Sequence, residues 1–328
     1  MDGVTVTMIT LHMLSTALSP ITHMHGTAGN VALLQREAIL GKDGQVYSIP
    51  CLSGNALRHS LVRAPAAEFM CDAVGMGLMP YQLADLLWHG GRLTKATPLT
   101  AGATKSLLET VPFLALLGGA LPGQILQGCL KVSRGLLVCD EAADIIERRS
   151  GVAVQNTHGA ETFVGSYLYT RGAEENNPEA VADRMIYEGE CVKAGAKFYH
   201  TMSLEMESPL VIGCLLTALT AAAKDIGGMG RIGHGELHIE WTCDGIADEN
   251  ALIDGYTDYL KQNAEAVRGT LLDLFGDVPA KPEAEEKPEK PEKKPAKKSK
   301  KTADDKIKAD ALKATQTDLD FFGSTPEA

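Results

Sequence analysis

Several features that define large classes of proteins are scarce or missing in this sequence of 328 residues. Aromatic residues make up only 5% of the chain, so its core must be built mainly from aliphatic side chains. No apolar run reaches the roughly 20 residues that span a bilayer, and no basic stretch at the N-terminus suggests a signal peptide. The seven cysteines form no C-x-x-C pair, which disfavours a disulfide framework or a zinc ribbon and favours a cytoplasmic location.

Positively charged residues are also fewer than negatively charged ones. Lys and Arg number 31 against 42 Asp and Glu, which gives a net charge of −11. The last segment, 279–328, is nearly neutral, so the negative charge belongs to residues 1–278. A uniformly basic surface for nucleic acid is therefore excluded. A nucleic-acid site would have to be local, made of a few Arg and Lys side chains and backbone amides within an acidic body.

What is present indicates an α+β fold with a substantial core, since 45% of the residues are hydrophobic. Hydrophobic patterning predicts strands over 4–13, 197–206 and 235–242 and helices over 53–63 and 209–223. In this order they fit one βαββαβ sheet, ferredoxin-like or RRM-like, with an insertion at about 64–195. The patterns also predict a loop over 15–30, a polar irregular stretch over 152–190, helices over 81–88, 105–117 and 256–275, and a hairpin of 124–132 with 135–140.

The composition changes sharply near Gly276, which predicts a globular domain over 1–278 and a disordered tail over 279–328. The tail begins with a run of Lys, Pro and Glu that cannot bury enough apolar surface to offset the entropy of ordering. It ends in an acidic and aromatic peptide. Gln316, Leu319 and Phe321 match the Q-x-x-L-x-F form of bacterial sliding-clamp peptides, although a solvated acidic end has the same composition.

A glycine-rich run occupies Gly227–Gly235. Gly228, Gly230 and Gly233 match G-x-G-x-x-G, but a dinucleotide site needs a strand before the motif and a helix after it, and here the order is reversed. Such a backbone can instead pass close to another polymer and offer its amides, with Arg231 and His234 as side-chain donors. A merely flexible turn is the alternative.

Two further segments carry chemistry that suits phosphate groups. Ser53, Gly54 and Asn55 place small polar residues at a helix start, with Arg58 one turn on, where an anion would bind; an ordinary capped helix would look the same. His23 and His25 could ligate a metal, but no Cys or carboxylate nearby completes a site. A polar loop that contacts phosphates or bases fits this segment better. No Ser-His-Asp, Cys-His or paired-carboxylate set stands out by its spacing.

Taken together, three segments resemble the RAMP superfamily of CRISPR-associated proteins. YSIPCLSGNALRHSLVR over 47–63 resembles the element IPGSSLKGxLR, VKAGAKF over 192–198 resembles VPAGxxF, and the run over 227–235 resembles a C-terminal glycine-rich loop. They occur in the family's order within residues 1–242. The combination is similar to the backbone subunits of class 1 effector complexes, the Cas-seven group, and most like the type IV branch.

The resemblance implies an RRM-like palm over 1–63 and 196–245, an inserted helical finger region over about 64–150 and a thumb hairpin over about 152–190. It also implies a helical filament of copies along a CRISPR RNA, with a complementary target strand and other effector subunits as partners. The implied RNA-binding residues are His23, His25, Thr27, Asn30, Ser53, Gly54, Asn55, Arg58, Arg63, Gly228, Gly230, Arg231, Gly233 and His234. Arg171, Arg184 and Met185 are implied at the thumb, where the guide–target duplex is kinked.

The resemblance also bears on catalysis. Type III backbone subunits cut target RNA with an Asp in the first loop, whereas this chain has no Asp or Glu between Ser15 and Glu37. We therefore expect no target cleavage by this chain, no cofactor and no metal. The alternatives are a type III-like ribonuclease that uses His, a guide-independent single-strand binding protein, and a replication accessory docked on a sliding clamp.

Overall fold

The computed structural model describes residues 8–155, 157–171, 185–205, 208–221, 225–243 and 245–275. They belong to a compact unit that spans Met1–Ala280, and a second unit spans Lys281–Ala328. The tail expected over 279–328, with its candidate clamp peptide, therefore lies outside the described residues. Within the described part, no helix is both long and apolar enough for a membrane span.

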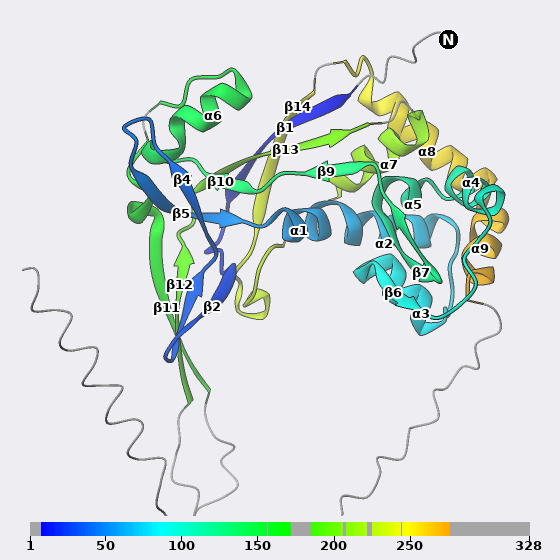
Figure 1. Cartoon of the computed structure of the whole chain (residues 1–328), viewed down its shortest axis with the longest axis horizontal. Helices are drawn as coiled ribbons and strands as arrows, with labels where there is room; N and C mark the ends of the chain where they lie inside the picture. The colour runs from blue at the N-terminus through cyan, green and yellow to red at the C-terminus, as the bar shows by residue number, and fades with distance from the viewer. Residues whose placement is uncertain are drawn as a thin grey trace, which may run out of the picture. The chain divides into compact units, whose positions relative to one another are not determined.

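Antiparallel strands form the centre of the main sheet (Figure 1). β1 (Ile9–Ala17) alternates between buried and half-buried residues, as a strand with one face on a core must. It pairs with β13 (Lys197–Leu204) on one side and β14 (Leu237–Cys243) on the other. Beyond β13 lie two short strands, β9 (Leu130–Val132) and β10 (Gly135–Leu137), which both pair with it.

Two helical segments pack together beside this sheet. The first runs without interruption through α1 (Gly54–Leu57), the wider π-helical η1 (Arg58–Arg63) and α2 (Ala64–Ala73). The second is α7 (Pro209–Thr220), whose residues from Val211 to Leu219 are all buried, as its apolar sequence predicted. If β9 and β10, which follow β13 in turn, are counted as one interrupted strand, these elements read in chain order strand, helix, strand, strand, helix, strand. The fold is mixed α+β with antiparallel sheets and is consistent with an RRM-like palm.

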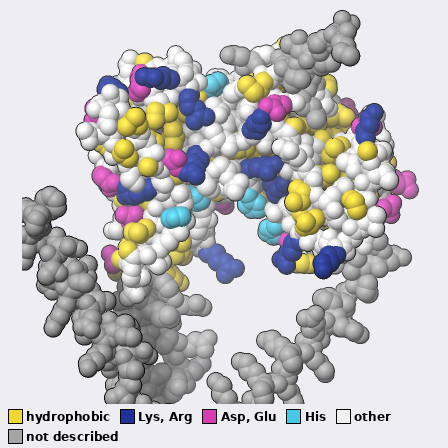
Figure 2. Space-filling model, viewed as in Figure 1, with side chains coloured by type: hydrophobic (Ala, Val, Ile, Leu, Met, Phe, Trp, Pro, Cys, Tyr) yellow, Lys and Arg dark blue, Asp and Glu magenta, His cyan; other side chains and the backbone are white. Residues whose placement is uncertain are grey.

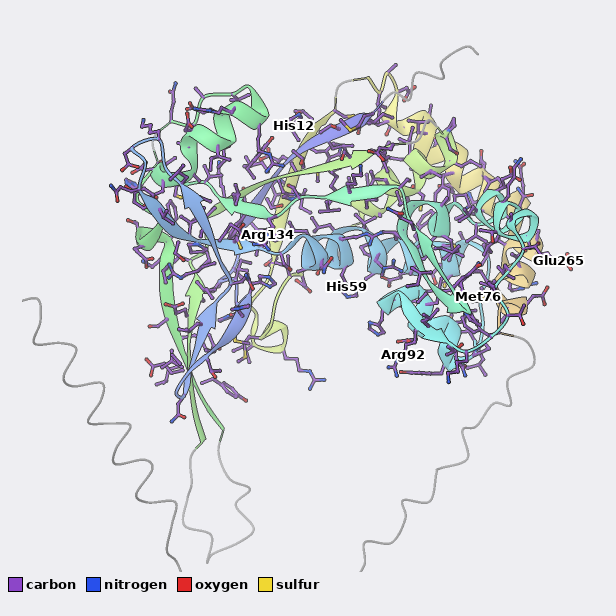
Figure 3. All side chains as sticks on the ribbon, in the orientation of Figure 1. His12, His59, Met76, Arg92, Arg134 and Glu265 are labelled. Carbon is purple, nitrogen blue, oxygen red and sulfur yellow. The ribbon has the colours of Figure 1, made fainter. Side chains whose placement is uncertain are left out.

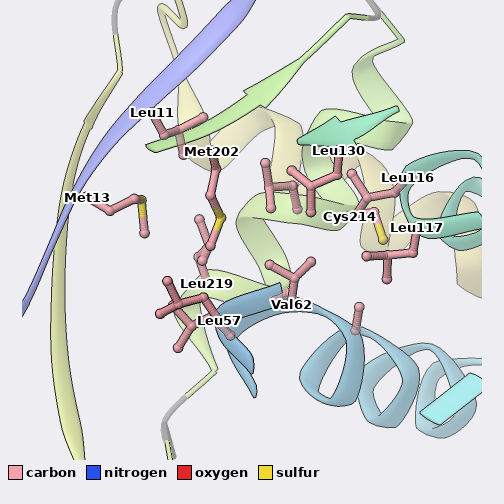
Figure 4. Packing of buried hydrophobic residues seen from close by; sticks show 14 of the residues in the cluster. Leu11, Met13, Leu57, Val62, Leu116, Leu117, Leu130, Met202, Cys214 and Leu219 are labelled. Carbon is pink, nitrogen blue, oxygen red and sulfur yellow. The ribbon is translucent and has the colours of Figure 1, made fainter. Parts of the chain in front are cut away.

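The core between these elements is aliphatic, as the scarcity of aromatic residues requires. Figure 4 shows side chains from the sheet, the first helical segment, α5 and α7 converging on one interior. Those labelled there include Leu11, Met13, Leu57, Val62, Leu117, Met202, Cys214 and Leu219. All of these side chains are almost completely buried.

The structure departs from the predicted loop over 15–30. A hairpin of β2 (Met24–Ala28) and β3 (Val31–Leu34) lies there, and β4 (Arg36–Leu40) and β5 (Val46–Leu52) extend the main sheet past β10. A second insertion therefore separates the first strand from the first helix. The exposed residues of β2 lack the alternating apolar pattern by which a strand is predicted.

The stretch over 152–190, predicted as polar and irregular, contains an antiparallel ribbon. β11 (Val164–Arg171) pairs with β12 (Met185–Val192), and β12 also pairs in parallel with β3. These strands make a second sheet in the order β11-β12-β3-β2. The ribbon falls within the range that the family resemblance assigns to a thumb, while residues 172–184 lie outside the described part.

The predicted hairpin of 124–132 with 135–140 is wrong. β8 (Gln124–Gln127) pairs with β7 (Gly118–Pro122), and β9 and β10 do not fold back on each other but follow β13 in turn. Backbone hydrogen bonds explain this path, since Ser133 N donates to Thr201 O (2.9 Å) and so keeps the supposed turn on β13.

Helices occupy the predicted ranges 81–88, 105–117 and 256–275, whereas the helix over Ala143–Ser150 was not predicted. A break at Val111, before Pro112, divides the predicted helix over 105–117, and a break at Asn263 divides the last one. The elements not yet introduced are α3 (Tyr81–Ala84), η2 (Asp85–His89), β6 (Gly91–Thr94), α4 (Ala101–Thr110), α5 (Pro112–Leu117), η3 (Asp140–Ala142), α6 (Ala143–Ser150), η4 (Ala160–Phe163), η5 (Gly230–Ile232), α8 (Glu249–Gln262) and α9 (Ala264–Asp273).

We predict that Gly213→Ala lowers the free energy of unfolding by about 1–3 kcal/mol. A Cβ at Gly213 on α7 would lie 2.3 Å from the backbone oxygen of Leu252, so α8 would have to move. Gly255→Ala on α8 is the matched control, because its Cβ meets nothing within 4 Å, and it should stabilise the helix by up to about 1 kcal/mol. Urea unfolding of both variants measures the difference; equal effects would contradict the close packing.

We also predict that stability falls as the pH drops below about 6.5, in part because of His200. This side chain is fully buried on β13, with Nε2 3.0 Å from Ser15 Oγ, and burial lowers the pKa of His200 to about 3. Below the unfolded pKa the unfolded chain takes up a proton that the folded chain excludes. Urea unfolding between pH 7 and pH 4 should show a shallower loss for His200→Gln than for the wild type.

Candidate nucleic-acid interface

The start of the first helical segment has the cap that the sequence predicted. Ser53 Oγ accepts a hydrogen bond from Ala56 N (3.2 Å), as an N-cap residue does. Ser53 N in turn donates to His23 Nε2 (3.1 Å), so that imidazole nitrogen is an acceptor, and burial lowers the pKa of His23. The helix start is thereby tied to the segment that precedes β2.

Gly54 has a packing role at this helix start. A Cβ there would lie 2.7 Å from the backbone oxygen of Val132 on β9, so only glycine lets the helix begin so close to that strand. Its neighbour Asn55 is exposed, and Arg58 is half-buried one turn along. The site residues Ser53, Gly54, Asn55 and Arg58 are thus brought together, as their sequence spacing predicted.

The glycine-rich run reaches the same place from the other end of the chain. Gly228 N donates to Thr22 O (2.7 Å), and His234 Nδ1 lies 2.6 Å from Thr22 Oγ1. Gly227, at a φ of +85°, has no room for a Cβ, which would lie 2.4 Å from Thr22 O. Residues 22–23 therefore join the helix start to the glycine-rich run. We call this pair of residues the junction.

Side-chain donors of the run lie at its surface. Arg231 is exposed in η5, between α7 and β14, and Gly230 and Gly233 beside it have open space where a Cβ would be. His234 is half-buried and meets the Tyr167 ring of β11 edge-on, with centroids 5.7 Å apart. The run thus bridges the junction and the second sheet.

A cavity of about 400 Å³ opens at the helix start. It is lined by Ser53, Gly54, Asn55, Arg58, Leu130, Val132 and Arg134. Arg134 is exposed and forms an ion pair with Glu37 of β4. Figure 2 shows Lys, Arg and His side chains along the hollowed middle of this face, and Figure 3 places Arg134 and His59 on either side of α1. Sequence analysis missed Arg134, because it was assigned to a hairpin turn.

Arg63 was predicted to contact RNA, but its side-chain donors are engaged within the fold. Its guanidinium is buried and donates to four backbone oxygens, those of Leu86, Leu87, Leu117 and Gly118. It also lies over the Phe113 ring, 5.7 Å from the centroid. Burial, and then the nearby Arg58, lower the pKa of Arg63 to about 10. These donors are already used inside the fold, so they are not available to a phosphate.

The wide π-helical turn places Arg58 beside Arg63. A π-helix closes hydrogen bonds between residues five apart, so these two side chains come to nearly the same side. Both donate to one acceptor: Arg58 Nη2 lies 2.6 Å and Arg63 Nη2 3.1 Å from Leu117 O. Arg58 Nε has no partner among the described residues.

Most of the other predicted residues lie on strands of the second sheet. His25 and Thr27 are exposed on β2, and Asn30 is exposed at the turn before β3. Arg171 and Met185 are paired in the backbone register of β11 and β12, whereas Arg184 lies outside the described residues. In the described part of the chain, no three His, Cys, Asp or Glu side chains gather as a metal site would require.

Comparison with known proteins shows a likeness to solved structures. No protein-family model matches the chain, and no curated protein matches it. A solved structure described as "Type IV-B CRISPR Complex" contains a chain of similar fold, with a TM-score of 0.55 and 21% sequence identity. The alignment covers 73% of this chain and 93% of that one. At this level of identity, the likeness shows a shared fold.

We predict that Arg63→Lys lowers the free energy of unfolding by about 2–4 kcal/mol. An ammonium group cannot replace the fork that holds four carbonyl oxygens. Arg231→Lys is the matched control at an exposed position and should change stability little. Thermal and urea unfolding measure both variants; a stable Arg63→Lys protein would show that the guanidinium is dispensable to the fold.

Proposed function

We propose that this chain is a CRISPR RNA-binding backbone subunit of a class 1 effector complex, most like type IV. In this role, copies of the chain assemble along the guide RNA with other effector subunits and support pairing between the guide and a target strand. The chain itself does not cut the target.

The observation that carries the proposal is the junction. Ser53 and Gly228, from two of the three family-like segments, are hydrogen-bonded to residues 22–23. The fold in which they meet is similar to a chain of a type IV-B CRISPR complex over 73% of this sequence. These two motifs are more than 170 residues apart in the sequence, and the fold brings them to one surface, as a shared binding site requires.

The chemistry of this surface suits the backbone of a single strand. Hydrogen-bond donors surround the helix start and the glycine-rich run. They come from the half-buried Arg58 and from three exposed residues, Asn55, Arg134 and Arg231. Such contacts position a polynucleotide without reading its bases, which is what an RNA-guided complex needs, because the guide reads sequence by base pairing. The acidic remainder of the chain would discourage binding of nucleic acid elsewhere.

Target cutting has little support at this surface. The first loop carries no carboxylate, and His23 already uses Nε2 to accept from Ser53 N. A general base must be free to take a proton from the attacking group. His23 therefore fits a role in holding the helix start better than a role in catalysis.

The first test is the nucleic acid that the protein carries. After expression with its neighbouring genes and a CRISPR array, extraction and a denaturing gel should reveal an RNase-sensitive RNA of discrete length that contains spacer sequence. Heterogeneous fragments would instead favour a guide-independent single-strand binding protein. Protein free of nucleic acid would contradict the proposal, and cleavage of a matching target would favour the ribonuclease alternative.

Two variants with the same change of charge test whether RNA contacts the glycine-rich run. We expect Arg231→Glu to reduce the affinity for single-stranded RNA about 10-fold, because repulsion replaces one phosphate contact. Lys105→Glu makes the same charge change on the exposed face of α4 and should have little effect. Fluorescence anisotropy with labelled RNA at several salt concentrations measures both. Equal losses would mean that only the total charge matters.

A further inference from the structure

A second cavity, of about 910 Å³, continues from the helix start. Asn55 and Arg58 line both this cavity and the smaller one, so the two share a wall along the first helical segment. The far part of the larger cavity is lined by His59, His89 and Gly90, and by residues of α5, β7, β8 and β9. A strand that passes the helix start along this wall reaches those residues next.

Two exposed imidazoles stand together there. His59 of η1 and His89 of η2 are stacked, with ring centroids 6.2 Å apart and planes inclined by 19°. This separation lets one phosphate group accept hydrogen bonds from both rings. Neither ring was singled out by sequence analysis, because the two residues are 30 positions apart and match no motif.

The charges around the pair favour an anion. Arg58 and the buried Arg63 come from the same helix as His59 and supply the net positive charge of the lining. The carboxylate in the cavity lining, Glu205, is paired with Lys131. Asp85, at the start of η2, is paired with Arg92 (3.2 Å). The remaining titratable group of the lining, Cys129, has its pKa raised by burial and stays a neutral thiol.

We propose that His59 and His89 form a phosphate-binding subsite for a single-stranded nucleic-acid backbone, continuous with the contacts at the helix start. This inference rests on the proposed function and adds to it a site that takes up protons on binding. Burial, then His89 and Arg63, lower the pKa of His59. A bound phosphate opposes that shift, so binding at this subsite tightens as the pH falls through the range in which His59 titrates.

The test uses the full-length chain and fluorescently labelled single-stranded RNA at pH 6 and pH 8. We expect the wild type to bind more tightly at pH 6, and the double variant His59→Gln, His89→Gln to lose about 10-fold in affinity at pH 6 but little at pH 8. The matched control is His238→Gln, an exposed histidine on β14 that is not among the lining residues of either cavity. It should behave as the wild type does.

A second variant separates charge from shape. His59→Arg, His89→Arg carries positive charge at both pH values, so it should bind tightly at both and lose most of the pH dependence. If the glutamine variant binds as the wild type does at pH 6, while Arg231→Glu still weakens binding, the subsite is wrong and the proposed function stands. If the wild type binds no RNA at either pH, both are wrong.

Discussion

The arrangement of the candidate interface depends on one short stretch of backbone, Thr22 and His23. Thr22 O accepts from the glycine-rich run, the His23 ring accepts from the helix start, and His23 O accepts from Gln35 N (2.7 Å) as β3 ends. Each hydrogen bond is individually worth only about 0.5–1.5 kcal/mol. Together they fix where a helix start, a hairpin and a loop lie relative to one another.

A second constraint holds the helical region in place. The buried guanidinium of Arg63 donates hydrogen bonds to backbone oxygens of η2 and of the α5–β7 turn, and so ties these two segments to the first helical segment. The two segments that carry His59 and His89 are therefore held together by a buried side chain. An arginine at this position looks from sequence like one more phosphate contact, but its donors stabilise the surface on which such contacts stand.

Sequence patterns predicted the elements whose signals are local. The cap at Ser53, the apolar α7 and the alternating β1 follow from residue spacing, and the structure contains all three. The hairpin β2–β3 was missed because the residues of β2 are exposed and the pairing of β3 with β12 is non-local. Arg134 and the His59–His89 pair were missed for a related reason, since only tertiary packing brings these side chains to one surface. The burial of Arg63 depends on backbone carbonyl oxygens that accept its hydrogen bonds and lie 23 to 55 residues further along the chain.

The oxygen of Leu117 shared by Arg58 and Arg63 has a consequence for how the interface can respond. Were Arg58 its sole donor, turning that side chain toward a phosphate would strand a buried carbonyl, a loss of about 1–3 kcal/mol that the ligand would have to offset. Because Arg63 remains 3.1 Å from the same oxygen, Arg58 can leave it without orphaning it. The π-helical turn thus gives Leu117 O a second donor, Arg63. Arg58 is therefore free to exchange this oxygen for a phosphate group.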